Sequence, residues 1–444
     1  MRLSSWLPIA VLSALTVSDA ATRPRYGGTL RVEMRAAPSA LDPAAADADP
    51  LRSLVFETLV RLDEAGAPQP CLALSWQHDA TAKRWQFNLR PAVKFHDGSP
   101  LTAAAVVPSL QAALPAMTVA AAGDTVTIRA NHPLPDLLLD LAHNGWLDTG
   151  PFRSAAFEPG RHATFAANED YWGGRPFLDA IDVQLGRGLR DQLADLELGK
   201  ADVVEAGPTD LRRASDHGRA IWASAAVSLI ALAFAPAPDR SDAPRLREAL
   251  ALSIDRAAMH TVLLQKQGEI SAALLPQWIS GYAFAFPTAP DLPRARALAA
   301  ALAPAARTLT LTYDPSLRAA RSLAERVAVN ARDAGLTVQV SPQNPHADVR
   351  LVEVRLRSLD PAQALAGIAA ALSLQAPAAP DAAPSPAALY ESERKLLDGF
   401  GAIPLFQLPV LYGAASRVRV YAPPPITRLG DWRFDNVWLS GTAP

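Results

Sequence analysis

The sequence predicts an α/β protein with mixed sheets, built from two or more domains. The chain has 444 residues, about three times the length at which one hydrophobic core stops growing. Apolar residues make up 50% and charged residues 19% of the chain, a composition typical of globular proteins. Along the chain, segments with strand-like alternation are followed by segments with helical periodicity and then by further strands. This order favours an α/β fold.

Residues 1–20, MRLSSWLPIAVLSALTVSDA, are expected to be a cleavable export signal. Arg2 precedes an apolar stretch, and Ser18 and Ala20 are small residues suited to a cleavage site. A membrane anchor is the alternative, but the stretch is shorter than the roughly 20 residues that a membrane-spanning helix needs. Because Ala21 follows instead of a cysteine, we expect a soluble periplasmic protein that is not a lipoprotein.

The first half of the chain alternates short strands and helices. In chain order, the patterns predict a strand at 29–34, a helix at 50–60, strands around Trp76 and at 85–89, a turn at 96–98 and a helix at 103–114. Thr102 stands directly before the last of these helices, where its hydroxyl can accept a backbone N–H. We therefore expect it to be the N-cap.

The second half shows longer helical patterns. A helix is predicted at 242–264 with Gly268 beyond its end, and another at 316–334 closed by Gly335. Strands are predicted at 336–340 and 350–357. Residues 375–387 are rich in Ala and Pro and are expected to form an exposed loop or linker without a regular element.

Charge and cysteine content exclude several kinds of protein. The formal net charge of −2 gives no electrostatic basis for binding nucleic acid or an anionic membrane. Cys71 is the single cysteine, so a disulfide within the chain and a multi-cysteine metal site are excluded. Its apolar neighbours indicate a thiol with a raised pKa that packs as a small hydrophobic side chain.

Sequence motifs of catalysis are missing. The chain has no G-x-S-x-G, no G-x-x-x-x-G-K-[ST], no H-E-x-x-H and no G-x-G-x-x-G after a strand. Its eight histidines are scattered, with no pair spaced to share one helix face. We therefore expect neither an enzyme nor a cofactor or metal site.

Eleven short segments together resemble a known family. They are 26–32 (YGGTLRV), 38–43, 56–60, 70–76, 87–90, 93–103 (VKFHDGSPLTA), 149–152, 168–174 (NEDYWGG), 199–203, 246–250 and 254–256. In this order they resemble the extracytoplasmic solute-binding proteins, family 5, of the dipeptide, oligopeptide and nickel ABC importers. The resemblance covers most of the chain from about residue 26 to 282 and again from about 308 to 444.

The resemblance implies a two-lobed periplasmic-binding-protein clamshell of class II, the large peptide-binding type. Lobe I would comprise residues 21–232 and 408–444, and lobe II residues 233–407. The chain would cross between the lobes near 229–234 and 403–409. The implied function is that of a monomer that binds a small solute between the lobes and delivers it to an ABC permease in the inner membrane.

The sequence departs from the dipeptide-binding members at both peptide anchors. The Asp-Pro pair of the family is kept as Asp360-Pro361, but the acidic position before it, which would bind the peptide ammonium, falls on Arg357. The family's arginine before a Tyr-Asn-Pro run, which would bind the carboxylate, is absent here, since Thr312 precedes Tyr313. These departures favour a solute that is peptide-like or an anionic organic molecule, and not a plain dipeptide.

Six residues are candidates for ligand binding: Asp47, Trp146, Trp278, Tyr313, Arg355 and Arg357. Strand alternation places Arg355 and Arg357 on one face with Glu353. Arg357 either binds a ligand carboxylate or phosphate, or it pairs with Glu353 or faces solvent. The aromatic residues either line the cleft or belong to ordinary packing.

Three functions remain open on the sequence. The first is a periplasmic binding protein of an ABC importer. The second is a degenerate clamshell that acts as an interaction or sensor protein, because residues 103–145 and 357–400 are short for the family. The third is a periplasmic hydrolase, which the missing nucleophile and base make the weakest of the three.

Overall fold

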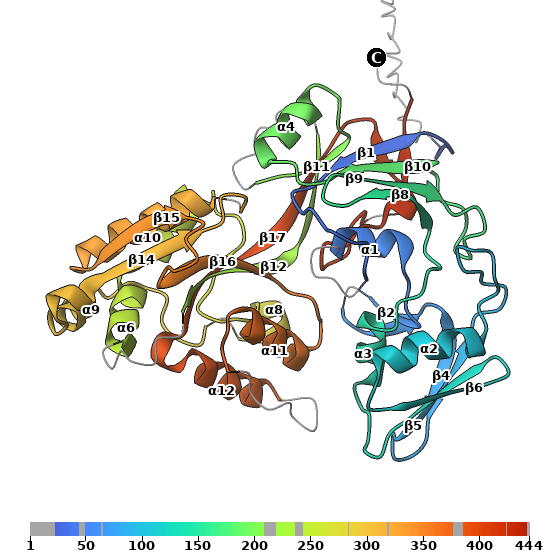
Figure 1. Cartoon of the computed structure of the whole chain (residues 1–444), viewed down its shortest axis with the longest axis horizontal. Helices are drawn as coiled ribbons and strands as arrows, with labels where there is room; N and C mark the ends of the chain where they lie inside the picture. Colours follow the sequence, from blue (N-terminus) through green and yellow to red (C-terminus); the bar gives the residue numbers. More distant parts are fainter. Residues whose placement is uncertain are drawn as a thin grey trace, which may run out of the picture.

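The protein consists of two lobes that face each other (Figure 1). The computed structural model describes residues 23–43, 49–63, 65–207, 219–235, 243–282, 284–317, 319–375, 385–422 and 424–441. We call lobe I the described part before β12 together with the part after β17, and lobe II the part between these two strands. The expected export signal and Asp47 lie outside the described residues.

One large mixed sheet runs through both lobes. Its strand order is β15-β14-β16-β12-β17-β11-β1-β10-β9-β8, with β13 paired to β17. The strands are β1 Thr29–Glu33, β8 Phe152–Glu158, β9 His162–Ala167, β10 Ala180–Gln184, β11 Val203–Glu205, β12 Ala220–Phe234, β13 Glu269–Ile270, β14 Thr308–Tyr313, β15 Thr337–Pro342, β16 Val349–Arg355 and β17 Ala402–Ala414. β1 is parallel to β10 and β11, and β14 to β15 and β16, while the other pairs are antiparallel. The predicted α/β class with mixed sheets is confirmed.

The two longest strands, β12 and β17, pass side by side from one lobe to the other. Residues 227–234 of β12 are all buried, as are nearly all residues of β17, which fits strands covered on both faces. Their pairing shifts register between Ala223 and Ala226 and again before Ser228. Both expected crossing segments fall within these strands, and the exact limits between the lobes stay a prediction.

A smaller antiparallel sheet with its own core forms the lower part of lobe I in Figure 1. It contains β4 Ala73–His78, β5 Arg84–Leu89, β6 Thr118–Ala122 and β7 Thr125–Arg129, packed beside α2 Ala103–Ala113, α3 Leu137–His143 and the hairpin β2 Val60–Leu62 with β3 Pro68–Pro70. Trp85, Phe87 and Leu89 point inward, as their alternation predicts. The Thr102 cap is confirmed, because its hydroxyl accepts from the Ala105 N–H at 3.2 Å.

Helices pack around the large sheet. Lobe I has α1 Asp49–Val55, α4 Leu189–Glu197 and the C-terminal strands β18 Val418–Val420 and β19 Val437–Leu439. Lobe II has α6 Ala243–Ser253, α7 Arg256–Val262, α8 Gln277–Ser280, α9 Leu292–Ala300, α10 Ala320–Asp333, α11 Pro361–Ala371 and α12 Pro386–Leu397. None of the described helices is long and apolar enough to cross a membrane.

Four predicted elements differ from the structure. The helix predicted at 50–60 ends at Val55, because Glu57 forms a bridge with Leu147 and β2 begins at Val60. The long helix predicted at 242–264 is two helices, since Asp255 leaves the helical conformation and caps α7 by accepting from the Ala258 N–H at 2.9 Å.

The other two differences lie in the Ala/Pro segment and at the end of β16. Residues 386 and 387 begin α12, with Ser385 as N-cap and Pro386 in the first turn. Serine followed by proline is a helix-start signal that the composition of the segment obscured. Residues 376–384 lie outside the described residues. β16 ends at Arg355, so Arg357 follows the strand instead of belonging to it.

Candidate functional site

A cleft of about 830 Å³ lies between the lobes. Lobe I contributes residues around α1, the loop after α3 and the segment 427–436, and lobe II contributes residues 355–359 and Gln363. Ten charged side chains belong to its lining: Arg52, Arg61, Arg355, Arg357, Arg428 and Arg433 against Glu57, Asp63, Asp431 and Asp435. The described lining therefore carries two more cationic than anionic groups, before any charge on His143.

The lobe I wall holds Trp146 in one orientation. Its indole Nε1 donates to the His143 carbonyl at 3.0 Å, and its own carbonyl accepts from Ser109 Oγ at 3.0 Å. The Arg52 guanidinium lies 4.8 Å from the ring centroid and donates to the Pro43 carbonyl at 2.8 Å. A cation held over an indole face adds favourable electrostatic energy. Trp146 is thus a fixed aromatic surface in the cleft.

Glu57 is the hydrogen-bonding centre of the same wall. Its carboxylate accepts from Thr149 Oγ1 at 2.8 Å, Tyr171 OH at 2.9 Å and Trp172 Nε1 at 2.7 Å. Burial raises its pKa, and the three donors oppose that shift. Burial and the neighbouring Glu57 together raise the pKa of the Tyr171 phenol well above its usual value. The contact explains why three of the sequence motifs, around residues 57, 149 and 171, occur together.

Cys71 packs beside this carboxylate. It is buried, and its Sγ lies 3.9 Å from Glu57 Oε1. Burial and the Glu57 charge raise the pKa of the thiol to about 12. Since the thiolate is the reactive form, the thiol is inert at neutral pH, which confirms the structural role that the sequence predicted.

Gly150 connects α1 to this wall through close backbone packing. Its N–H donates to the Val55 carbonyl at 2.9 Å, and its carbonyl accepts from Asn168 Nδ2 at 3.0 Å. A Cβ at this position would stand 2.6 Å from the carbonyl carbon and oxygen of Val55. Only glycine allows the chain this close to the end of α1.

Gly150→Ala is expected to destabilise lobe I by about 1–3 kcal/mol, the usual cost of overpacking. The clash is with backbone, which cannot move aside as a flexible side chain can. Urea unfolding followed by tryptophan fluorescence would measure the loss. Gly367→Ala is a control for glycine replacement without a clash, because Gly367 has no positive φ and no atom lies within 4 Å of its Cβ position. A Gly150 variant no less stable than wild type would contradict the packing argument.

The lobe II wall carries the two predicted arginines. The Arg355 guanidinium donates to the Leu429 carbonyl at 2.8 Å and lies 3.7 Å from Asp431 Oδ1, so it connects lobe II to the C-terminal segment of lobe I. Arg357 is exposed and lines the cleft two residues beyond β16. Of the predicted site residues, Trp146, Arg355 and Arg357 thus line one cleft.

Two of the other three candidates lie outside the cleft lining, and the third is not among the described residues. Trp278 donates from Nε1 to the Ala226 carbonyl at 3.0 Å and stacks under the Arg428 guanidinium at 4.1 Å, directly behind the cleft lining. Tyr313 is 8% exposed and belongs to the hydrophobic core of lobe II. Asp47 lies outside the described residues.

The sequence did not indicate several residues that line the cleft. Arg428, Asp431, Arg433 and Asp435 come from the irregular segment before β19, which has no periodicity to interpret. His143 also lines the cleft; burial lowers its pKa, and its Nε2 has no hydrogen-bond partner within the described residues. Glu57 could have been found, because it lies within one of the family-like segments.

Within the described part of the chain, no group of three or more His, Cys, Asp and Glu side chains is placed to hold a metal ion.

A family model matches more than half of the chain. The model describes bacterial extracellular solute-binding proteins, family 5 (middle part), and it matches residues 67–131 and 141–386. Among curated proteins, the oligopeptide-binding protein AppA of Bacillus subtilis is 22% identical over 325 residues, which cover 63% of this chain and 59% of AppA. The nickel-binding protein NikA of Staphylococcus aureus is 23% identical over 223 residues, 45% of each chain. The matches thus span about half the length of these relatives.

Solved structures show the same fold. NikA from Staphylococcus aureus in complex with Ni(L-His)2 superposes with a TM-score of 0.78 and 16% identity, covering 93% of this chain and 100% of that one. MoaA from A. tumefaciens R10 in complex with mannopinic acid gives a TM-score of 0.76 and 18% identity, covering 93% and 99%. AppA from Bacillus subtilis with a nonapeptide gives 0.75 and 17%, covering 94% and 100%. The expected clamshell of the large peptide-binding type is confirmed.

Proposed function

Because the chain belongs to family 5 of the bacterial extracellular solute-binding proteins, we propose that it is the substrate-binding protein of an ABC importer. It captures a small organic solute, peptide-like or anionic, between its lobes in the periplasm and delivers it to a membrane permease. The family consists of binding proteins and not of enzymes, in agreement with the missing catalytic motifs. The protein acts as a monomer after removal of its export signal.

The observation that carries the anionic preference is the lining of the cleft. Six arginines face four carboxylates there, and guanidinium groups bind carboxylate and phosphate through paired hydrogen bonds. Arg357 is the best placed of them, because it is exposed at the lobe II wall, at the position where dipeptide-binding relatives carry an acid. Trp146, on the opposite wall, offers an aromatic surface for the apolar part of the solute.

The direct test is to look for the ligand. Native mass spectrometry of the purified mature protein, before and after mild denaturation, would detect a solute that copurifies. A thermal-shift screen of peptides, opines, sugar phosphates and metal chelates would follow. A ligand at about 100 times its Kd stabilises the fold by about 2.7 kcal/mol, which is a shift of a few degrees for lobes of this size.

Arg357→Asp is expected to weaken binding of an anionic hit from this screen about 10- to 100-fold, because one charge-assisted hydrogen bond contributes about 1.5–3 kcal/mol. Isothermal titration calorimetry would measure the change. Arg350→Asp is the matched control, since Arg350 lies on β16, the strand that precedes Arg357, and is exposed, but it does not line the cleft. Equal affinities of the two variants for the solute would show that Arg357 does not bind it.

One observation favours the alternative of a degenerate clamshell. Cleft arginines already bind protein groups: Arg355 contacts Leu429 and Asp431, and Arg52 contacts Pro43 and Trp146. A cleft that satisfies its own charges can support docking or sensing without solute capture. A mass without bound ligand, together with a flat thermal-shift screen, would support this second function.

A further inference from the structure

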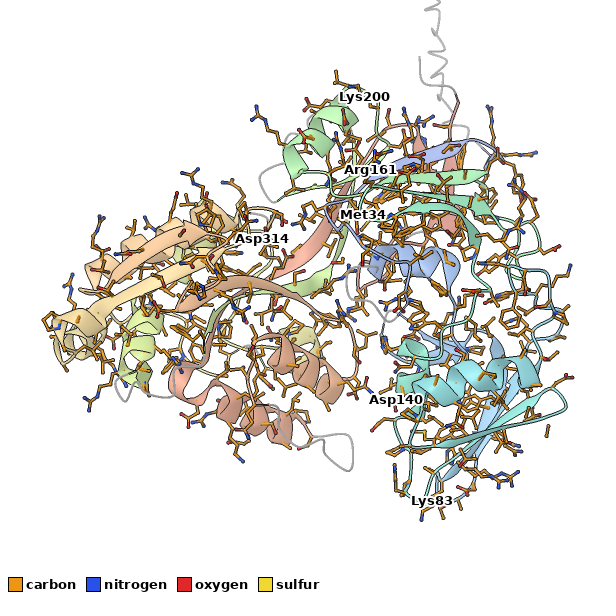
Figure 2. The ribbon with its side chains drawn as sticks, viewed as in Figure 1. Met34, Lys83, Asp140, Arg161, Lys200 and Asp314 are labelled. Atoms are coloured by element: carbon orange, nitrogen blue, oxygen red, sulfur yellow. The ribbon has the colours of Figure 1, made fainter. Side chains whose placement is uncertain are left out.

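The lobes meet at a polar contact beside the cleft, between α3 of lobe I and the start of α11 of lobe II. Gln363 Nε2 donates a hydrogen bond to Asp140 Oδ1 across 223 positions of sequence. In Figure 2, the labelled Asp140 lies on the side of lobe I that faces lobe II. Gln363 lines the cleft itself, so the contact lies at its edge.

Both partners are held in place by their own lobe. Leu137 and Leu141 of α3 are buried in the core of the small sheet, which turns Asp140 away from that core. On the other side, Ser358 Oγ donates to Gln363 Oε1 at 3.3 Å, and the Gln363 N–H donates to the N-cap Asp360 at 2.7 Å. The amide of Gln363 is therefore oriented with its NH2 group toward Asp140.

The surroundings of the contact oppose any further negative charge. Burial raises the pKa of Asp140, the Gln363 hydrogen bond opposes this, and the charges of Asp136 and Asp360 raise the pKa further. His143 follows on the same helix, near Asp360 and Asp431. An additional negative charge at position 363 would be repelled by the carboxylates of Asp136, Asp140 and Asp360.

We propose that Asp140 and Gln363 form an interlobe latch that stabilises the closed arrangement of the lobes and thereby positions the cleft for solute capture. The latch sets affinity through the fraction of molecules in the binding-competent state, without contacting the solute through Asp140. Its role in capture rests on the proposed function, whereas the contact between the lobes does not.

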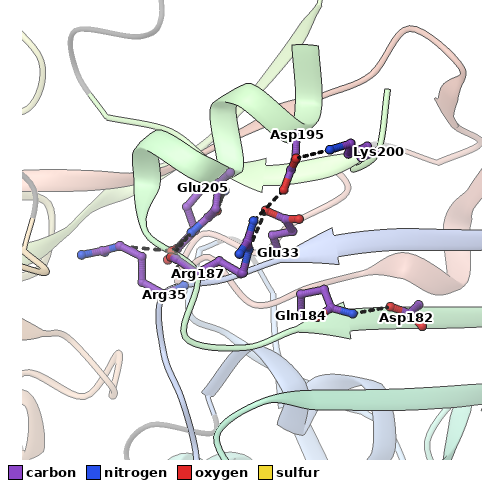
Figure 3. Close-up of polar contacts among 9 residues, drawn as sticks. Glu33, Arg35, Asp182, Gln184, Arg187, Asp195, Lys200 and Glu205 are labelled. Carbon is purple, nitrogen blue, oxygen red and sulfur yellow. Dashed lines mark hydrogen bonds and ion pairs between the residues drawn. The ribbon is translucent and has the colours of Figure 1, made fainter. Parts of the chain in front are cut away.

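Two further contacts join the lobes. One is the contact of Arg355 with Leu429 and Asp431 described above, and the other is a hydrogen bond of Arg35. Arg35, directly after β1, pairs with Glu205 at 3.1 Å and donates from Nη1 to the Ser316 carbonyl of lobe II at 2.9 Å. Figure 3 shows Arg35 paired with Glu205, beside Arg187, which lies between Glu33 and Asp195. This contact stays intact in every variant below.

The test reverses the polarity of the latch. Gln363→Glu places a carboxylate against Asp140, and the ratio of closed to open molecules should fall roughly tenfold or more, the equivalent of one charge-assisted hydrogen bond. Adding Asp140→Asn supplies an amide that donates to Glu at position 363, so the double variant should close again. Asp140→Asn alone keeps an acceptor oxygen and loses the charge, so it should lose only the charge-assisted part of the contact and open less than Gln363→Glu.

Single-molecule energy transfer without added solute would measure closure. Dyes on Lys83→Cys in lobe I and Lys395→Cys in lobe II report the distance between the lobes, and both positions are exposed. The buried Cys71, with its pKa of about 12, does not compete for the dyes. Gln339→Glu, exposed on β15, adds the same charge away from the interface and should change nothing.

Two results would overturn the latch. One is a Gln363→Glu variant as closed as wild type, and the other is a double variant as open as the single one. Unchanged melting temperatures and circular dichroism would establish that each variant is folded. If the latch behaves as proposed while wild type binds no member of the solute panel, the failure belongs to the proposed function and not to the latch.

Discussion

Asp202→Ala is expected to lower the free energy of unfolding of lobe I by about 3–5 kcal/mol, the usual cost of removing one partner of a buried ion pair. The Asp202 side chain is 1% exposed and binds two guanidinium groups, Arg31 and Arg417, at 2.6–2.9 Å. Its backbone also pairs with β1 and with Ala415. Without the carboxylate, two arginines remain close together with no anion between them.

The loss of stability caused by Asp202→Ala should depend on pH. Burial by itself raises the pKa of Asp202, but hydrogen bonds from Arg417 and Arg31 outweigh it and hold the pKa below its ordinary value. A lowered carboxyl pKa contributes stability that is present above the unfolded pKa of about 3.9 and is lost as the pH falls through the folded pKa. The difference between wild type and variant should therefore be constant near pH 7 and shrink below about pH 4.

Urea unfolding at a series of pH values would measure this difference. Asp170→Ala is the matched control, because Asp170 forms an ion pair with Lys94 that is exposed on both sides. Exposed pairs contribute about 0–1 kcal/mol. A loss at Asp202 no larger than that at Asp170 would show that the double arginine pair does not stabilise lobe I.

Glu57→Ala should cost about 2–4 kcal/mol, since it removes the acceptor from three donors at once and each unsatisfied buried donor costs about 1–3 kcal/mol. Thr149 is 1% exposed, so water cannot replace its lost acceptor. The wall around Trp172 and Tyr171 would lose its fixed geometry, and solute affinity should fall together with stability. Denaturant unfolding and calorimetry with a screened ligand would measure the two effects.

Glu57→Gln separates hydrogen bonding from charge. Glutamine keeps one acceptor oxygen, so it should retain at least about half of the lost stability. The pKa of Glu57 is raised, so ionisation opposes folding and wild type loses this part of its stability as the pH rises through the folded pKa. The stability of the Glu57→Gln variant relative to wild type should therefore be highest at neutral pH. An alanine variant as stable as the glutamine variant would show that the three donors do not depend on this acceptor.

Local signals in the sequence predicted local structure well. The strand at 85–89 and the Thr102 cap depend on neighbours within a few residues, and both are confirmed. The break between α6 and α7 was missed, because continuous apolar spacing through Ile254 hides the point where Asp255 turns its side chain to cap a new helix. Apolar periodicity indicates which face of a helix is buried, but it does not show whether one helix continues or a second one begins.

The cleft could be predicted only in part. The family-like spacing before Asp360 identified Arg357 as a candidate, and Arg357 does line the cleft. Tyr313 is an aromatic residue of the kind that often lines binding sites, but it packs in the core of lobe II. Arg428 and Asp431 reach the cleft from the far end of the chain, through contacts that no short-range pattern encodes.

The order in which the chain is synthesised decides which lobe can complete its fold first. Asp202 pairs with Arg417, and Trp222 packs near Phe434 in the core of lobe I, so this lobe needs residues that are synthesised last. Lobe II, by contrast, has most of its partners within one continuous stretch. Until residues 412–417 are present, β11 lacks its neighbour β17 and Asp202 lacks Arg417. Truncating the chain before these residues should therefore leave lobe I incompletely folded and open to proteolysis.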